Sequence, residues 1–301
     1  FIQFSQMLFT PLRQIADKFN TLQMGMVAAN RVFGILETEA RIEDKGTHLL
    51  SGIKGDLSFE DVRFSYVQDE EVLRGINLEV KAGETVAIVG STGAGKSTII
   101  NLLGRFYEID SGTIKIDGVD IRDVQVASLR SEIAVVLQDV FLFADSILNN
   151  ITLNNPEISE EDVVDAAKAI GVDQFISSLP NGYHYNVKER GAMLSSGQRQ
   201  LIAFLRAYVS NPSILVLDEA TSSVDSNSEY LIQKAINKIT KGRTSIVIAH
   251  RLATIKKADK IIVMEKGQIV EMGSHKELLQ VENGHYRNLH EVQFAANQEP
   301  A

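Results

Sequence analysis

The sequence of 301 residues predicts an α/β fold with a mainly parallel central sheet. The first observation behind this prediction is a set of short, continuous apolar runs, typical of strands buried on both faces of a parallel sheet. The runs are Thr85–Val89, Ile214–Leu217, Ser245–Ala249 and Ile261–Met264. The second observation is a helical period between Asn149 and Asn211. The third is a glycine-rich loop directly after the first run, where a strand of such a sheet leads into a helix.

A long helix is predicted first along the chain. From Leu12 to Leu36 apolar residues recur in alternating steps of three and four, which places them on one face of a helix. The other face is polar, and an uninterrupted seam of this kind is typical of packing between helices. The preceding segment is more apolar and contains Pro11, and the chain starts with Phe1 rather than Met. We therefore expect a helix that continues upstream of residue 1, followed by a linker over residues 41–55.

A peripheral antiparallel β subdomain is predicted after the linker. Leu57–Phe64 alternates between apolar and polar residues, as a half-buried strand does. Asn77–Val80 and Thr113–Ile116 add shorter alternating stretches, divided by glycine turns.

A helical subdomain is predicted at about residues 140–211. Ser159 and Asp162 have the spacing of a capping box, which predicts a helix that runs to Ala169. A further helix begins near Ser196, and the Asn211-Pro212 pair ends it, because proline disfavours helical backbone in the residue before it.

The composition excludes several classes of function. A formal net charge of -9 and the absence of a Lys/Arg run argue against a nucleic-acid partner. No segment reaches the roughly 20 apolar residues that a membrane-spanning helix needs. The chain has no cysteine, so disulfides, thiolate metal sites and cysteine nucleophiles are excluded.

The glycine-rich loop is a phosphate-binding motif. Its residues are Gly90, Ser91, Thr92, Gly93, Ala94, Gly95, Lys96 and Ser97, followed by Thr98, and they fit G-x-x-x-x-G-K-[ST] between a strand and a helix. The glycines let backbone N–H groups converge on phosphate oxygens, and the start of the helix adds its positive dipole end. Lys96 is expected to bridge the terminal phosphates, and Ser97 to offer its hydroxyl to Mg²⁺. The sequence therefore predicts a P-loop NTPase core.

An acidic pair ends the second apolar run. Asp218 follows Ile214–Leu217 at the carboxyl end of the strand, where ligands bind in open α/β sheets. We expect Asp218 to hold Mg²⁺ through water. Glu219 follows it and is the candidate general base for the water that attacks the γ-phosphate.

The pentapeptide Leu194–Gln198 is a second phosphate-binding element. It contains two serines and a glycine where a helix opens, and it resembles the signature motif of the ATP-binding cassette (ABC) ATPases. The resemblance covers nearly all of residues 55–290. Residues 90–97 then resemble the Walker A loop of that family, Asp218 and Glu219 the end of Walker B, Gln138 the Q-loop glutamine, Asp225 the D-loop aspartate and His250 the switch histidine.

This resemblance implies the roles of further residues. Tyr66 resembles the aromatic residue that stacks on adenine, and His250 is expected to hydrogen-bond a γ-phosphate oxygen. Gln138 would touch both Mg²⁺ and the attacking water. The implied cofactors are ATP and Mg²⁺. The implied catalytic residues are Glu219, His250, Gln138 and Lys96, and the implied metal-binding residues are Ser97, Gln138 and Asp218.

The resemblance also implies a dimer. In the family two nucleotide-binding domains pair head to tail, so Ser195, Gly197, Gln198 and Asp225 would complete the site of a second copy rather than their own. The expected partners are a second nucleotide-binding domain, the same or different, and a transmembrane domain. The expected division is 1–50 for the cytoplasmic extension of the last transmembrane helix with its linker, and 51–301 for the nucleotide-binding domain.

Two features favour the exporter branch of the family. Glu189-Arg190-Gly191 partly matches the loop that exporters carry before the signature, and Phe141-Leu142-Phe143 is expected to form an exposed apolar ledge. One departure is Ser196, where the family usually has glycine. The resulting hypothesis is an ATP-hydrolysing motor at the cytoplasmic face of a membrane.

Two other functions are alternatives to this hypothesis. A soluble cassette ATPase acting on DNA or ribosomes would need a coiled-coil insertion, tandem cassettes or basic arms, and the sequence has none of them. A nonhydrolytic switch is disfavoured because Glu219 and His250 are both present.

Overall fold

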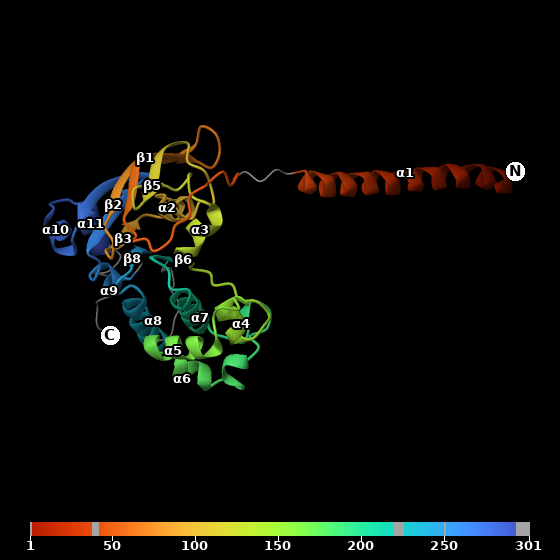
Figure 1. Cartoon of the computed structure of the whole chain (residues 1–301). Helices are drawn as coiled ribbons and strands as arrows, with labels where there is room; N and C mark the ends of the chain where they lie inside the picture. Colours follow the sequence, from red (N-terminus) through yellow and green to blue (C-terminus); the bar gives the residue numbers. More distant parts are fainter. Residues whose placement is uncertain (1, 38–41, 219–225, 250, 293–301) are drawn as a thin grey trace. The chain divides into compact units, whose positions relative to one another are not determined.

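The structure is a computed structural model, and it describes residues 2–37, 42–218, 226–249 and 251–292. The chain divides into two compact units, Phe1–Glu43 and Asp44–Ala301. Figure 1 shows the course of the chain and gives the element labels.

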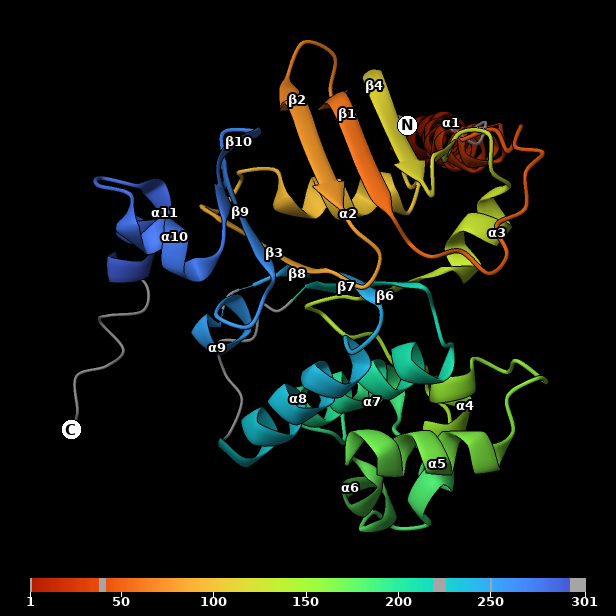
Figure 2. The same ribbon diagram turned by 60° about the vertical axis from the view of Figure 1, so that its left-hand side comes forward.

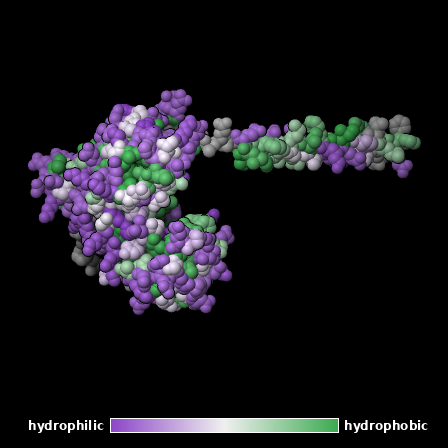
Figure 3. Space-filling model, viewed as in Figure 1, coloured by the Kyte–Doolittle hydropathy of each residue, from purple (hydrophilic) through white to green (hydrophobic). Residues whose placement is uncertain are grey.

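The first unit contains one helix, α1 (Ile2–Leu36), which confirms the predicted long helix and runs without a break through Pro11. Apolar side chains of the predicted seam, among them Leu12, Ile15 and Phe19, are more than half exposed. Figure 3 shows both apolar and polar side chains on the surface of α1. Within the described residues, no helix combines the length and the apolar character needed to cross a bilayer.

The second unit contains two sheets. The four-stranded antiparallel sheet has the order β2-β1-β4-β5, with β1 (Leu57–Ser65), β2 (Glu71–Val80), β4 (Ser111–Ile116) and β5 (Val119–Asp120). The six-stranded sheet has the order β10-β9-β3-β8-β7-β6, with β3 (Thr85–Gly90), β6 (Ile133–Val136), β7 (Ile214–Asp218), β8 (Thr244–Ile248), β9 (Lys260–Glu265) and β10 (Gln268–Gly273). Its neighbouring strands are parallel except for the β9–β10 pair. Both the mainly parallel sheet and the peripheral antiparallel sheet are confirmed.

The helices of the second unit include the three predicted ones, after the phosphate-binding loop, after Ser159 and from Ser196. They are α2 (Lys96–Leu103), α3 (Val126–Ser131), α4 (Ile147–Thr152), α5 (Glu160–Ile170), α6 (Asp173–Ser177), α7 (Ser196–Val209), α8 (Ser226–Ile239), α9 (Leu252–Ile255), α10 (His275–Gln280) and α11 (His285–His290). Figure 2 shows α2 with β1, β2 and β4 above the six-stranded sheet, and α4 to α8 below it.

Side chains of the central strands alternate between two hydrophobic cores. In β7, Ile214 and Val216 belong to the core shared with α2 and the antiparallel sheet, whereas Leu215 and Leu217 belong to the core shared with the helices below. Successive side chains of a strand point to opposite faces. Because both faces are covered, most positions of these strands are apolar, which explains the continuous runs in the sequence.

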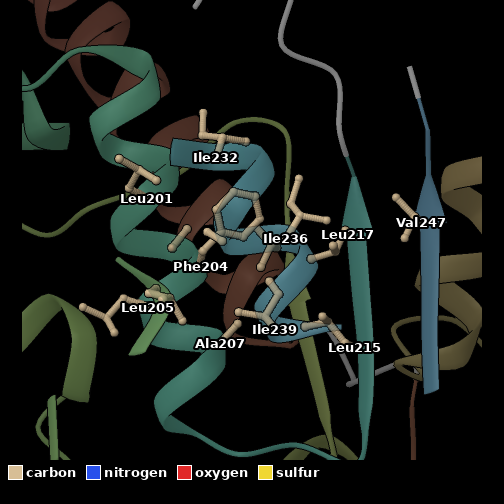
Figure 4. Packing of buried hydrophobic residues seen from close by; sticks show 14 of the residues in the cluster. Leu201, Phe204, Leu205, Ala207, Leu215, Leu217, Ile232, Ile236, Ile239 and Val247 are labelled. Atoms are coloured by element: carbon tan, nitrogen blue, oxygen red, sulfur yellow. The ribbon is translucent and has the colours of Figure 1, made fainter. Parts of the chain in front are cut away.

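Helices α7 and α8 cover the lower face of the sheet. Figure 4 shows Leu201 and Phe204 of α7 pointing toward Ile232 and Ile236 of α8, with Leu217 of β7 beside them. Phe204 is fully buried. Burying a side chain of this size stabilises the fold by about 1.5–3 kcal/mol. This hydrophobic core therefore holds α7 against the sheet, including the strand β7 that ends with Asp218.

Local signals set the helix ends as predicted. Ser159 Oγ accepts a hydrogen bond from the N–H of Asp162, and the Asp162 carboxylate accepts one from the N–H of Ser159, so the capping box of α5 is present. Helix α7 ends at Val209, two residues before Asn211, whose φ is 46°. A left-handed residue followed by proline stops a helix sharply.

The structure differs from the prediction at the ledge Phe141–Phe143. Phe141 and Phe143 are exposed, but Leu142 is fully buried, because its side chain joins the core beneath the sheet. The sequence interpretation also did not include β10, α10 or α11. Strand β10 is paired on one side only and alternates between exposed and half-buried residues, so it lacks the apolar run that marks the central strands.

Candidate nucleotide-binding site

A cavity of about 490 Å³ opens at the carboxyl ends of β3 and β7. It brings together most of the predicted binding residues that the structure describes: Tyr66, Thr92, Gly93, Gly95, Lys96, Ser97, Thr98, Gln138 and Asp218. Val72 and Ile248 also line it. Residues that lie more than 150 positions apart in the chain meet here because parallel strands end at the same edge of a sheet.

The phosphate-binding loop connects β3 to α2. Gly95 is the N-cap residue of α2 and has a φ of 98°, a conformation that residues with a Cβ rarely adopt. At Gly90 a Cβ would collide with the carbonyl oxygen of Met264 in the neighbouring strand β9. Glycine is therefore required at position 95 by the backbone conformation and at position 90 by the close approach of β9. Ser91 and Ala94 lie between them in the loop.

Lys96 lies folded back on its own loop. Its Nζ donates hydrogen bonds to the carbonyl oxygens of Gly90 and Ser91 at 2.9 and 2.8 Å, and the residue is only 9% exposed. Burial lowers the pKa of the Lys96 ammonium, and the Asp218 carboxylate acts in the opposite direction. A phosphate group would have to replace these carbonyl oxygens as the acceptors of the ammonium group.

Three oxygen-bearing side chains face the same cavity. Val136 of β6 pairs with Leu217 of β7, so Gln138 and Asp218 follow at the ends of adjacent parallel strands. Ser97 lines the cavity from the first turn of α2. A hydroxyl, an amide and a carboxylate are all hard oxygen donors of the kind that Mg²⁺ binds. The donor set therefore fits the predicted metal.

Three predicted residues lie outside the described part of the chain. They are Glu219, Asp225 and His250. The structure therefore places neither the candidate general base nor the switch histidine.

The predicted adenine-binding residue, Tyr66, follows β1 and is 42% exposed. Its hydroxyl donates a hydrogen bond to Thr98 Oγ1 at 3.3 Å and accepts one from Asn101 Nδ2 at 3.2 Å. The rings of Phe64 and Tyr107 both lie close to the Tyr66 ring and stand nearly perpendicular to it. Sequence reasoning did not include Tyr107 or Asn101. The signal available for Tyr107 was an aromatic pair, Phe106-Tyr107, shortly after the phosphate-loop helix.

The signature pentapeptide forms the start of α7. Ser195 is the N-cap residue: its Oγ accepts a hydrogen bond from the N–H of Gln198 at 3.2 Å, and Gln198 Oε1 accepts one from the N–H of Ser195 at 3.0 Å. Ser196 is exposed while Gly197 is buried. The added Cβ of Ser196 therefore causes no packing conflict. None of the described residues that line the 490 Å³ cavity comes from Leu194–Gln198.

A second, larger cavity of about 780 Å³ lies between β6, α4 and α7. Phe141 and Phe143 line it, with ring centroids 5.2 Å apart. Arg206 of α7 also lines it and donates a hydrogen bond to the carbonyl oxygen of Asn150 at 2.8 Å. Burial lowers the pKa of the Arg206 guanidinium. The cavity thus combines an apolar rim with charged side chains of both signs, Arg130 and Arg206 as well as Asp139 and Glu157.

Comparison with known proteins agrees with this geometry. The family model described as ABC transporter matches residues 73–222. The chain is 45% identical over 290 residues to an uncharacterized ABC transporter ATP-binding protein, YknV, of Bacillus subtilis, covering 96% of this chain and 48% of that protein. It is 48% identical over 279 residues to a fatty acid ABC transporter ATP-binding/permease protein of Mycobacterium bovis, covering 93% and 44%.

A solved structure extends the comparison to the fold. The chain superposes on a bacterial Atm1-family ABC exporter with ATP bound at a TM-score of 0.81 and 38% identity, covering 98% of this chain and 51% of that one. The chain thus spans about half the length of the relatives it matches. It belongs to the ABC transporter family, as an ATP-binding domain similar to those of its exporters.

Proposed function

We propose that this chain is the ATP-hydrolysing motor domain of an ABC exporter and that it binds MgATP between two such domains arranged head to tail. One observation carries the proposal. A single cavity collects Lys96, Gln138 and Asp218, while its described lining includes none of residues 194–198. A nucleotide bound there would lack the signature contacts within one chain, and a second copy could supply them.

The binding roles follow from the chemistry of each group. The loop N–H groups and the Lys96 ammonium would hold phosphate oxygens, while Tyr66 would stack on the base. Ser97, Gln138 and Asp218 would hold Mg²⁺, which, when bound, neutralises charge that develops on the phosphates.

The catalytic roles rest on the family resemblance. Glu219 would take a proton from the attacking water, and Gln138 would orient that water. His250 would donate a hydrogen bond to the γ-phosphate. Helix α7 would present its N-terminus and the Ser195 hydroxyl to the γ-phosphate held by the other copy.

A complementation assay tests the arrangement between two copies. Lys96→Ala removes the phosphate-binding lysine, and Ser195→Arg blocks the signature. We expect each variant alone to lose about 10²- to 10³-fold in turnover, because each lacks a group that stabilises the transition state. A mixed pair retains one intact site, formed by Lys96 of one copy and Ser195 of the other.

An equimolar mixture should therefore recover about a quarter of the wild-type rate, since about half of randomly formed symmetric pairs are mixed and each has one intact site of two. Phosphate release is the measurement. The control is the Lys96→Ala variant alone at the same total protein concentration. A mixture that stays as inactive as its components would overturn the arrangement between copies.

A transmembrane domain is the second proposed partner. Several relatives carry the description ATP-binding/permease, and the chain spans less than half of those from Mycobacterium bovis and one from Bacillus subtilis. The 780 Å³ cavity, rimmed by Phe141 and Phe143, is a hollow into which an apolar helix end of that domain could pack. Such docking would place the chain at the cytoplasmic face of the membrane.

A further inference from the structure

We propose that Tyr107 and Asn101 are positioning residues that hold the Tyr66 ring as a preformed platform for the adenine base. The inference rests on the proposed ATP binding and concerns how the same site selects a nucleotide over other polyphosphates. Neither residue lines the cavity, so both act through Tyr66.

Three aromatic rings form a compact cluster beside the cavity. The ring centroid of Tyr66 lies 4.7 Å from that of Phe64 and 5.0 Å from that of Tyr107, with interplanar angles of 87° and 88°. Phe64 and Tyr107 are themselves 5.7 Å apart. Edge-to-face pairs at these distances are attractive beyond the area that they bury. Each ring therefore restrains the other two.

One ring of the cluster is buried and the other two are partly exposed. Phe64 is 3% exposed and belongs to the core between β1 and α2, whereas Tyr66 and Tyr107 are 42% and 40% exposed. Because both neighbours stand nearly perpendicular to Tyr66, neither is stacked parallel to its ring. Since Tyr66 also lines the cavity and is partly exposed, a planar base in the cavity would be able to stack on its ring.

The Tyr66 hydroxyl ties the platform to the phosphate loop. Asn101 Nδ2 donates to this oxygen, which donates in turn to Thr98 Oγ1, and both partners lie on α2. Helix α2 also carries Lys96 and Ser97 in its first turn. One helix therefore sets the distance between the group that would bind the base and the groups that would bind the phosphates.

Removal of the Tyr107 ring should free Tyr66 and weaken binding of the base alone. Tyr107→Ala is expected to weaken MgATP binding about 3- to 10-fold, the range set by the loss of one aromatic pair. Magnesium tripolyphosphate offers the same phosphates without base or ribose, and its affinity should stay within about twofold. The chain has no tryptophan, so isothermal titration calorimetry is the measurement.

Two substitutions serve as matched controls. Tyr107→Phe keeps the ring and should bind MgATP as the wild type does, since no hydrogen bond of the Tyr107 hydroxyl is found among the described residues. Phe106→Ala removes the adjacent aromatic side chain, which is 48% exposed and lies 4.7 Å from the Arg130 guanidinium. It should leave both affinities unchanged.

A double-mutant cycle isolates the hydrogen bond from Asn101. Asn101→Ala should weaken MgATP binding about 2- to 5-fold, as expected for the loss of one hydrogen bond. In a Tyr66→Phe background, which lacks the hydroxyl, the same substitution should have no further effect. Additive losses would show that Asn101 acts on the site by another route and would overturn its assignment.

The outcomes separate this inference from the proposed function. A selective loss of MgATP affinity in Tyr107→Ala supports the platform. Equal losses for MgATP and tripolyphosphate, or no loss, would overturn the platform while the ATP site stands. A wild-type chain that bound neither ligand would overturn the proposed function.

Discussion

At the scale of single residues, Asn150 shows how one buried amide can organise a loop. It is completely buried on α4; its Oδ1 accepts from the N–H of Phe143, and its Nδ2 donates to the carbonyl oxygens of Phe143 and Ser146. The amide therefore pairs with both backbone polar groups of Phe143, as a neighbouring strand would, while the ring of Phe143 stays exposed.

Asn150→Ala should be strongly destabilising. The substitution leaves the N–H and carbonyl of Phe143 without this partner, and each buried polar group left unsatisfied costs about 1–3 kcal/mol. We expect a loss of about 2–4 kcal/mol in the free energy of unfolding, measured by urea denaturation. The control is Asn149→Ala, because Asn149 is less buried and, among the residues that the structure describes, its side chain bonds to Asp145 alone. A similar loss in both variants would contradict this account.

Residue-scale predictions from sequence succeed where the interaction is local. The capping box of Ser159 and Asp162 joins residues three apart, so its spacing alone predicted it. The box of Ser195 and Gln198 has the same spacing, although the sequence analysis did not include it. The contact between Tyr66 and Tyr107 joins residues 41 apart and depends on how β1 meets the segment after α2. The same limit explains the wrong prediction for Leu142, whose burial depends on the core beneath the sheet.

At the scale of elements, α10 and α11 are joined by a polar contact. His275 Nδ1 and the Tyr286 hydroxyl are 2.6 Å apart, and Tyr286 is 1% exposed. Burial raises the pKa of Tyr286 to about 12, so the phenol keeps its proton at neutral pH. Burial, and then the charges of Lys256 and His290, lower the pKa of His275. A neutral imidazole is therefore the form that suits the folded protein.

This contact predicts that acid weakens the α10–α11 pair. The folded pKa of His275 lies below the unfolded value of about 6.5. Its contribution to stability is therefore fully present above about pH 6.5 and is lost as the pH falls toward the folded pKa. Amide exchange in residues 275–290, measured at pH 7.5 and pH 5.5 and corrected for intrinsic rates, should show weaker protection at the lower pH.

His275→Gln tests the assignment, because glutamine does not titrate. It should remove the pH-dependent part of the protection, whereas His184→Gln should retain it, since His184 is exposed and pairs with Glu160 on α5. Unchanged pH dependence in His275→Gln would mean that another group titrates.

Element-scale prediction depends on the strength of the pattern. The central strands were predicted because burial on both faces leaves few polar positions in them, such as Thr244 and Ser245 of β8. Strand β10 alternates weakly at the sheet edge, and α10 and α11 have six residues each, too few for a helical period to emerge.

At the scale of the whole molecule, the meeting of Lys96, Gln138 and Asp218 could be predicted because it follows from topology. Each residue lies at or shortly after the carboxyl end of a parallel strand of the six-stranded sheet, and such strands end at one edge. The proposed pairing of two copies does not follow from this topology, because it depends on surfaces of a second molecule.

Glu219→Gln tests the proposed cycle of pairing. Without a general base the variant should bind MgATP but lose at least about 10²-fold in phosphate release. Because ATP would contact both copies, unhydrolysed ATP should stabilise the dimer by mass action. Size-exclusion chromatography with MgATP is the measurement, and Glu161→Gln on the exposed face of α5 is the control. Hydrolysis at the wild-type rate would contradict the role of Glu219.

The alternation of β7 between two cores has a consequence for insertions and deletions. A shift of one residue along β7 would send Leu215 and Leu217 to the opposite core and would displace Asp218 by about 3.3 Å, the rise of one strand residue. The hydrophobic side chains of β7 thus fix the register of the strand and, with it, the position of the Asp218 carboxylate. A length change inside this strand is therefore a change at the site, even though no ligand-facing residue has been replaced.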